Sequence, residues 1–234
     1  MRRFTFGICM LSLSALTAQA QLKRTVTRTT PTKPTATAAK AATEPDSSGI
    51  DRGAVLGHFY TNRTFGFDLT FPQTWIIPDD QYARSHRIEL GLRPPVGADP
   101  RTQTVVDSAL RRLTLLLSVY KYLPEFTPNS VVRVAVEDLT AQPQIKDAVD
   151  YIDAVRQSYA GSKLPAEVQF SATEAERLGN HQFAFIDLTT REGKTRMYAR
   201  VHNRFAILFK ITYEDDNDLQ TFRDVLANGN FLPK

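Results

Sequence analysis

Residues 60–75 read YTNRTFGFDLTFPQTW, and this run carries the clearest structural pattern in the chain. Asn62 and Gly66 bound a turn, because both residue types tolerate positive φ. Apolar side chains then recur with the period of a β-strand, which places on one face Phe65, Phe67, Leu69 and Phe71. Pro72 ends the pairing because it has no N–H to donate, and Trp75 is expected to plug the end of the sheet. The run therefore predicts a buried strand that organises the fold, not an active site.

The same run resembles the start of a PsbP-like domain. The shared pattern is Tyr-x-Asn-x-x-x-Gly-Phe-x-x-x-x-Pro-x-x-Trp, found here at Tyr60, Asn62, Gly66, Phe67, Pro72 and Trp75. The family is named for an extrinsic subunit of photosystem II, and a nuclear-transport cofactor of the Ran GTPase system shares its fold. The resemblance implies an α+β fold, an antiparallel β-sheet between helical layers (an α/β/α sandwich), and a non-enzymatic accessory or binding role. It is concentrated in residues 59–75; over 110–234 only the order of elements agrees.

The N-terminal residues have the pattern of an export signal. Arg2 and Arg3 precede an apolar run over 4–16, and Ala18-Gln19-Ala20 forms a small-x-small cleavage site. The run is shorter than the ~20 apolar residues that span a bilayer. Residues 1–20 are therefore predicted to be a cleaved signal peptide, the alternative being a retained anchor. The mature chain is expected to be secreted or periplasmic, with no transmembrane segment.

Residues 21–50 are predicted to be a disordered spacer, because this segment is rich in Thr, Pro and Ala and has almost no large apolar side chains. The whole chain carries a formal charge of +4, of which the signal peptide supplies two and the spacer a net three, leaving −1 for residues 51–234. The basic excess therefore belongs to the N-terminal segments. A nucleic-acid-binding domain would carry it on the folded surface, so no nucleic-acid partner is expected.

Cys9 is the only cysteine, and it lies in the predicted signal peptide. A mature chain without cysteine cannot form disulfides, use a thiolate nucleophile or bind metal through sulfur. Residues 51–234 are nevertheless long enough to bury roughly 70% of the unfolded surface, so one hydrophobic core can stabilise them. We expect a single domain over this range.

Alternating and apolar runs predict the strands, which are expected at 113–122, 131–138, 168–171, 181–190, 195–202 and 205–213. A helix over 143–160 is predicted to start at Pro143 and to bury Ile145, Ala148, Val149, Ile152, Val155 and Tyr159. A last helix is expected to be capped by Asp216 or Asn217 and to bury Leu219, Phe222, Val225 and Leu226. Phe231 and Leu232 are expected to hold the C-terminus against the body. The 76–110 segment is less clear: it suggests a strand over 86–92, a loop over 93–101 that could bind a partner, and a helix over 105–113.

No catalytic, cofactor-binding or metal-binding motif is recognised. The sequence lacks Gly-x-Ser-x-Gly, a P-loop and a dinucleotide-binding glycine pattern, and no two histidines have metal-ligand spacing. A hairpin centred on Glu192 would bring His181 nearly opposite His202, and with Glu214 or Asp215 they could form a metal site, although two exposed strand ends are the simpler interpretation. The acidic residues of 214–218 are interpreted as helix-capping groups rather than a calcium loop.

Five aromatic residues are candidates for a surface groove: Tyr120, Tyr122, Phe126, Tyr151 and Tyr159. The leading hypothesis is an exported, non-catalytic binding or accessory domain that acts through contacts with an unknown protein partner. The alternative is a small-molecule or metal-binding carrier of the cell envelope, with its pocket between the sheet and the helix over 143–160. Since core or rim positions are common for aromatic residues, these five do not decide between the two hypotheses.

Overall fold

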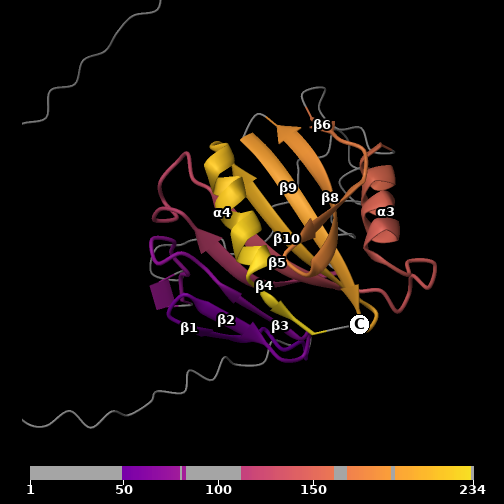
Figure 1. Ribbon diagram of the computed structural model, residues 1–234, viewed down its shortest axis with the longest axis horizontal. Helices are drawn as coiled ribbons and strands as arrows, with labels where there is room; N and C mark the ends of the chain where they lie inside the picture. Colours follow the sequence, from indigo (N-terminus) through magenta and orange to yellow (C-terminus); the bar gives the residue numbers. More distant parts are fainter. Residues whose placement is uncertain (1–48, 80, 83–111, 161–167, 191–192, 233–234) are drawn as a thin grey trace, which may run out of the picture. The chain divides into compact units, whose positions relative to one another are not determined.

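The fold is built on two antiparallel sheets, seen in a computed structural model that describes residues 49–79, 81–82, 112–160, 168–190 and 193–232 (Figure 1). All of these residues belong to one compact unit, Ala41–Lys234. The predicted signal peptide, the spacer up to residue 48 and most of the 76–110 segment, with the predicted strand and loop, lie outside the described residues. The predicted helix lies outside them too except at its end, where Leu113 is in a strand instead.

The larger sheet has seven strands in the order β4-β5-β10-β9-β8-β6, with β7 also paired to β8. Their bounds are β4 Leu113–Tyr120, β5 Val131–Asp138, β6 Gln169–Phe170, β7 Glu174–Leu178, β8 His181–Thr190, β9 Gly193–His202 and β10 Phe205–Tyr213. Asn203 and Arg204 have φ of 48° and 65°, so the β9–β10 connection is a two-residue turn with both central residues at positive φ. This central meander confirms the predicted hairpins.

The smaller sheet has four strands in the order β1-β2-β3-β11. Its strands are β1 Ala54–Leu56, β2 Phe59–Asn62, β3 Phe67–Thr70 and β11 Asn230–Phe231. The turn between β2 and β3 places Gly66 at φ 66°, as its glycine predicts, whereas Asn62 acts through its side chain. The Asn62 Oδ1 accepts a hydrogen bond from the Phe65 N–H at 2.9 Å. The prediction of a single sheet is wrong: β11 pairs with β3 across the whole length of the domain sequence, which local periodicity does not encode.

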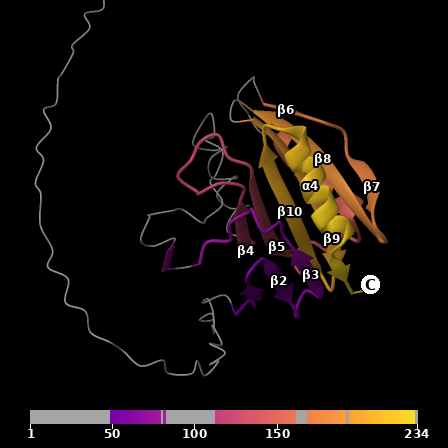
Figure 2. The ribbon, with the colours of Figure 1, turned by 60° about the vertical axis from the view of Figure 1, so that its left-hand side comes forward.

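One face of the larger sheet packs against the smaller sheet and helix α4 (Asp216–Ala227), as Figures 1 and 2 show. The buried face predicted for residues 65–71 is confirmed, and Trp75 is only 4% exposed. Phe67 and Phe231 of the smaller sheet meet Phe209 of β10 with ring centroids 5.5 and 5.8 Å apart. Such edge-to-face contacts add to the large apolar area that each ring buries. We call this region the aromatic core.

Helix α3 (Ala148–Ala160) packs on the opposite face, over β8 and β9. Its contact surface is aliphatic, with Ile152 fully buried beside residues such as Ile186 and Ala199. The buried Tyr151 hydroxyl donates a hydrogen bond to Glu137 Oε2 at 2.6 Å, and burial beside this carboxylate raises the Tyr151 pKa. This bond fixes the helix to β5.

The helix boundaries correct the sequence analysis. Helix α3 begins at Ala148, not near Pro143, because the Asp147 side chain accepts the N–H groups of Val149 and Asp150. The start places Val149 in the first turn with 42% of its surface exposed, although it was predicted to be buried. Helix α4 is capped by Asp215 rather than Asp216 or Asn217, and its predicted buried residues Phe222, Val225 and Leu226 are confirmed. Phe231 is buried as expected, whereas Leu232 is half exposed.

Candidate functional site

The loop that joins β4 to β5 exposes several large apolar side chains. Tyr122 is 52% exposed, Leu123 is 38% exposed and Phe126 is 58% exposed. We call residues 121–130 the aromatic loop; in Figure 1 it projects beside the upper end of α4. A single exposed apolar side chain is ordinary, but three in one short loop form a patch that could bind a partner.

Asn129 holds the aromatic loop closed on itself. Its Oδ1 accepts the Tyr122 N–H at 3.1 Å, while its Nδ2 donates to the carbonyls of Tyr122 at 3.2 Å and Leu123 at 3.1 Å. The Phe126 N–H also donates to the Leu123 carbonyl at 2.9 Å, which closes a tight turn. These bonds pair backbone N–H and carbonyl groups within the loop and so order its backbone. The exposed side chains are therefore carried by an ordered frame, the backbone of residues 121–130.

The base of the aromatic loop is anchored to α4 by a buried carboxylate. Asp218 is 6% exposed and accepts a hydrogen bond from Ser130 Oγ at 2.5 Å. The Lys121 ammonium lies 2.8 Å from the other carboxylate oxygen and donates a hydrogen bond of 3.0 Å to the oxygen that Ser130 binds, and this bond raises the Lys121 pKa. Both ends of the loop are thereby tied to the first turn of α4.

Two exposed carboxylates lie in the aromatic loop or near its base. Glu125 lies within the loop and accepts a hydrogen bond from the Tyr82 hydroxyl at 3.4 Å. Asp215 lies near Lys121, and its pKa is lowered mainly by the backbone hydrogen bond from Asn217 that caps α4. Both carboxylates are solvent exposed. With Lys121 paired to Asp218, the surroundings of the aromatic loop are net acidic.

The candidate aromatic residues do not form one groove. Tyr120 and Tyr151 are buried, at 4% and 3% exposure, while the Tyr159 ring packs 6.2 Å from Phe170 on the α3 side. Tyr122 and Phe126 are exposed in the same loop, so the candidate groove of five residues does not form, and the core interpretation holds for Tyr120 and Tyr151. Leu123 was missed, because periodicity cannot distinguish a buried from an exposed leucine in a loop; the flanking prolines were the available signal.

The hypothetical histidine site with Glu214 or Asp215 does not form. The β8–β9 register would set His181 opposite His202 if it continued, but the pairing of the two strands ends at Ala184↔Ala199. The His181 ring packs 4.9 Å from Phe231, and His202 Nε2 lies 2.9 Å from Asn203 Nδ2. His202 pairs with Phe205 at one end of β10 and Glu214 follows the other end, roughly 25 Å away at the rise of a strand.

Among the described residues, no three His, Cys, Asp or Glu side chains are grouped so that they could hold a metal ion. Within the same residues, no helix has the length and apolar character needed to cross a membrane. His58 is half buried, and His86 lies outside the described residues.

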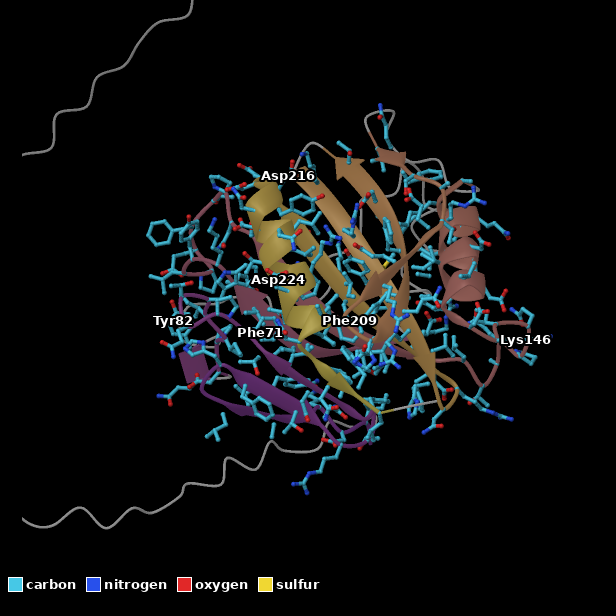
Figure 3. The ribbon with its side chains drawn as sticks, viewed as in Figure 1. Phe71, Tyr82, Lys146, Phe209, Asp216 and Asp224 are labelled. Carbon is cyan, nitrogen blue, oxygen red and sulfur yellow. The ribbon has the colours of Figure 1, made fainter. Side chains whose placement is uncertain are left out.

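A cleft is present where the carrier hypothesis expected a pocket, between α3 and the sheet. Its volume is about 470 Å³, and its walls include Asp147 and Val149 of the α3 N-terminus together with His181 and Arg200 of the sheet. Figure 3 labels Tyr82, the neighbour of the aromatic loop, on one side of the molecule and Lys146, next to Asp147 of the cleft, on the other. The two candidate regions are therefore separate.

Comparison with known proteins gives distant structural likenesses. No protein family matches the sequence, and no curated protein matches it. The solution structure of cyanobacterial PsbP (CyanoP) from Synechocystis sp. PCC 6803 is 11% identical over 77% of this chain and 96% of that chain, with a TM-score of 0.43. A crystal structure from Bacteroides thetaiotaomicron VPI-5482 is 12% identical with a TM-score of 0.35; the match covers 76% of this chain and about half, 49%, of that one.

Proposed function

We propose that this protein is an exported, non-catalytic accessory domain that binds another protein through the aromatic loop. The observation that carries the proposal is the exposure of Tyr122, Leu123 and Phe126 on a frame held by Asn129 and Asp218. Tyrosine is enriched among residues that dominate binding energies, and a loop that is ordered before binding loses less conformational entropy on association. Membership of the PsbP-like group, with its α/β/α sandwich, is part of this proposal and rests on the resemblance at residues 59–75.

The surroundings of the loop define the chemistry of the partner. Exposed Glu125 lies within the loop, and exposed Asp215 lies near Lys121 at the base of the loop. A complementary surface would offer an apolar pocket with Lys or Arg at its rim, since charges of opposite sign favour encounter and fix orientation. The predicted signal peptide and spacer would deliver the domain outside the cytoplasm and give it reach toward such a partner.

The first test is affinity capture from an envelope extract with the full chain, followed by mass spectrometry. The test variant carries Tyr122→Ser and Phe126→Ser, and the matched control carries Leu56→Ser on β1, where the side chain is 81% exposed. We expect one protein to be retained by the wild type and the control and lost by the double variant. With that protein purified, the double variant should bind at least about tenfold more weakly.

The charge of the partner is tested by salt. Affinity is expected to fall as ionic strength rises, because exposed charges are screened within about 10 Å at 0.1 M salt. Glu125→Gln should reduce that dependence without removing the apolar contacts. Retention of the same proteins by the double variant would contradict the proposed surface, and a turnover abolished by one substitution in the domain would overturn its non-catalytic assignment.

A further inference from the structure

Strands β8 and β9 separate at one end of the larger sheet, and the cleft lies at this opening. Their pairing runs from Thr190↔Gly193 to Ala184↔Ala199 and is not continued to the last residues of either strand, His181 to Phe183 and Arg200 to His202. Strand β8 remains paired to β7 there, and β9 remains paired to β10. The opening is therefore a local gap between two strands that are each held on their other edge.

The cleft reaches both faces of the sheet at this gap. Side chains alternate along a strand, so Phe183 and Arg200 lie on the aromatic-core face, whereas Ala184 and Val201 lie on the α3 face. All four line the cleft, and Val149 of α3 adds an exposed apolar wall. A volume of about 470 Å³ is within the range of small-molecule sites.

Arg200 presents a positive charge to this cleft without an acidic partner. Its guanidinium carbon lies 4.8 Å from the centre of the Phe231 ring and 5.9 Å from that of Phe183. In the described part of the chain no carboxylate oxygen lies within 4.0 Å of it, and burial lowers the pKa of this guanidinium. A half-buried cation on aromatic rings lacks the hydration that an exposed arginine keeps, so an anion beside it would be favoured.

Arg196, on the same strand, provides a comparison because it is an arginine paired with a carboxylate. It lies on the same face of β9, and its guanidinium binds Asp187 through two hydrogen bonds of 2.7 and 2.6 Å. Arg196 also lies over an aromatic ring, that of Phe185 at 4.2 Å. The two arginines therefore share strand, face and ring contact but differ in the carboxylate, which is the group missing at Arg200.

His181 lines the same cleft and can donate one ring N–H to a bound group. Burial and the nearby Arg200 charge lower the His181 pKa, because a protonated imidazole would lie close to the guanidinium. The acidic residue of the cleft, Asp147, accepts the N–H groups of Val149 at 2.9 Å and Asp150 at 3.0 Å and so caps its own helix. The amide side chains of Asn180 and Gln182 also line the cleft and can donate hydrogen bonds.

We propose that the cleft binds a small organic carboxylate whose negative group meets Arg200 and whose apolar body lies against Val149, Val201 and Ala184. Arginine suits this role because its planar guanidinium can offer two parallel N–H donors to a carboxylate. The site is separate from the aromatic loop and does not depend on the proposed protein partner.

The test is calorimetric titration of the full chain with benzoate, with benzamide as the neutral isostere and acetate as the anion without an apolar body. Benzoate is expected to bind saturably, and benzamide and acetate at least about tenfold more weakly, since hydrogen bonds that involve a charged group are the stronger ones. In the NMR spectrum, the Arg200 Nε–H signal should shift on adding benzoate while that of Arg196 stays in place.

Two pairs of variants locate the site. Arg200→Gln should weaken benzoate binding at least about tenfold, whereas Arg63→Gln, an exposed arginine in the β2–β3 turn, should not. Val149→Glu, at an exposed position that does not threaten folding, should weaken binding more than Val149→Gln, because both variants remove the apolar contact but only the glutamate adds a charge that repels the carboxylate. The Val149 pair decides the question if Arg200→Gln does not fold. The proposal would be overturned if benzoate did not bind or if benzamide bound equally well. It would also be overturned if the two variants of each pair lost the same affinity for benzoate.

Discussion

Aromatic residues have opposite surroundings in two regions of this molecule. In the aromatic core, Phe67, Phe209 and Phe231 are almost fully buried and touch one another edge to face or stacked. In the aromatic loop, Tyr122 and Phe126 are more than half exposed, and the bonds that order the segment come from polar side chains instead. The buried rings of the aromatic core therefore contribute to stability, whereas the exposed rings of the aromatic loop are available for recognition.

The largest expected effect is on the buried side of this comparison. Trp75→Ala should lower the free energy of unfolding by roughly 3–5 kcal/mol, because the 4% exposed ring leaves a cavity when removed. Phe126→Ala, in the loop, should change it by no more than about 0.5 kcal/mol. Urea denaturation of both variants measures the difference. Similar losses in the two variants would show that the loop ring is also part of the core.

Asp218→Asn tests the anchor that joins the loop to α4. The change removes the negative charge that pairs with Lys121, whose side chain is 27% exposed, and disturbs the bond from Ser130. A loss of about 1–3 kcal/mol is expected in urea denaturation, since the carboxylate is buried. The control is Asp216→Asn: this carboxylate is 75% exposed and pairs with Lys194 at the surface, so the loss should stay below about 1 kcal/mol. If the two variants lost the same free energy of unfolding, the buried Asp218 would contribute no more to stability than the exposed Asp216.

Asn129→Ala tests whether Asn129 orders the aromatic loop, and it leaves the exposed apolar side chains unchanged. It removes the three hydrogen bonds to the backbone of Tyr122 and Leu123, which should lower stability by about 1–2 kcal/mol. Hydrogen exchange should accelerate at residues 122–126 while the amides of β10 keep their protection. Unchanged exchange in the loop would mean that Asn129 does not order it.

The smallest effect concerns pH. The Asp215 pKa is lowered by the backbone and side-chain hydrogen bonds of the α4 cap, so the folded state binds this proton less readily than the unfolded state. Its contribution to stability is therefore present above the unfolded pKa of about 3.9 and is lost as pH falls through the lower folded value. Asp215→Asn retains a capping side chain and should remove this part of the pH dependence. A titration by NMR that finds an Asp215 pKa above that of an unfolded aspartate would contradict the sign.

The sequence was most reliable where a pattern is local. The alternation at Phe65, Phe67 and Leu69 reports a face directly, and the predicted bounds of β5, β8 and β10 agree with the structure. The predicted start of α3 was wrong. The helical spacing of apolar residues extends back to Ile145, before the true N-terminus of the helix, which Asp147 sets by capping. Of the candidate sites, Tyr122 and Phe126 were named, but nothing in their spacing separated them from the buried Tyr120.

Periodicity and turn residues in the sequence alone therefore determined the long strands β4, β5, β8, β9 and β10, the central meander and the buried face of residues 65–71, whereas the short strands β1, β7 and β11 were not predicted. Only the tertiary structure decided that β11 joins β3, that Asp218 is buried against Ser130, and that Arg200 has no carboxylate partner among the described residues while Arg196 has one. The physical reason is the separation along the sequence of the residues that interact. An alternating pattern arises from neighbours in the chain. Exposure, charge pairing and the opening between β8 and β9 depend instead on residues brought together by folding.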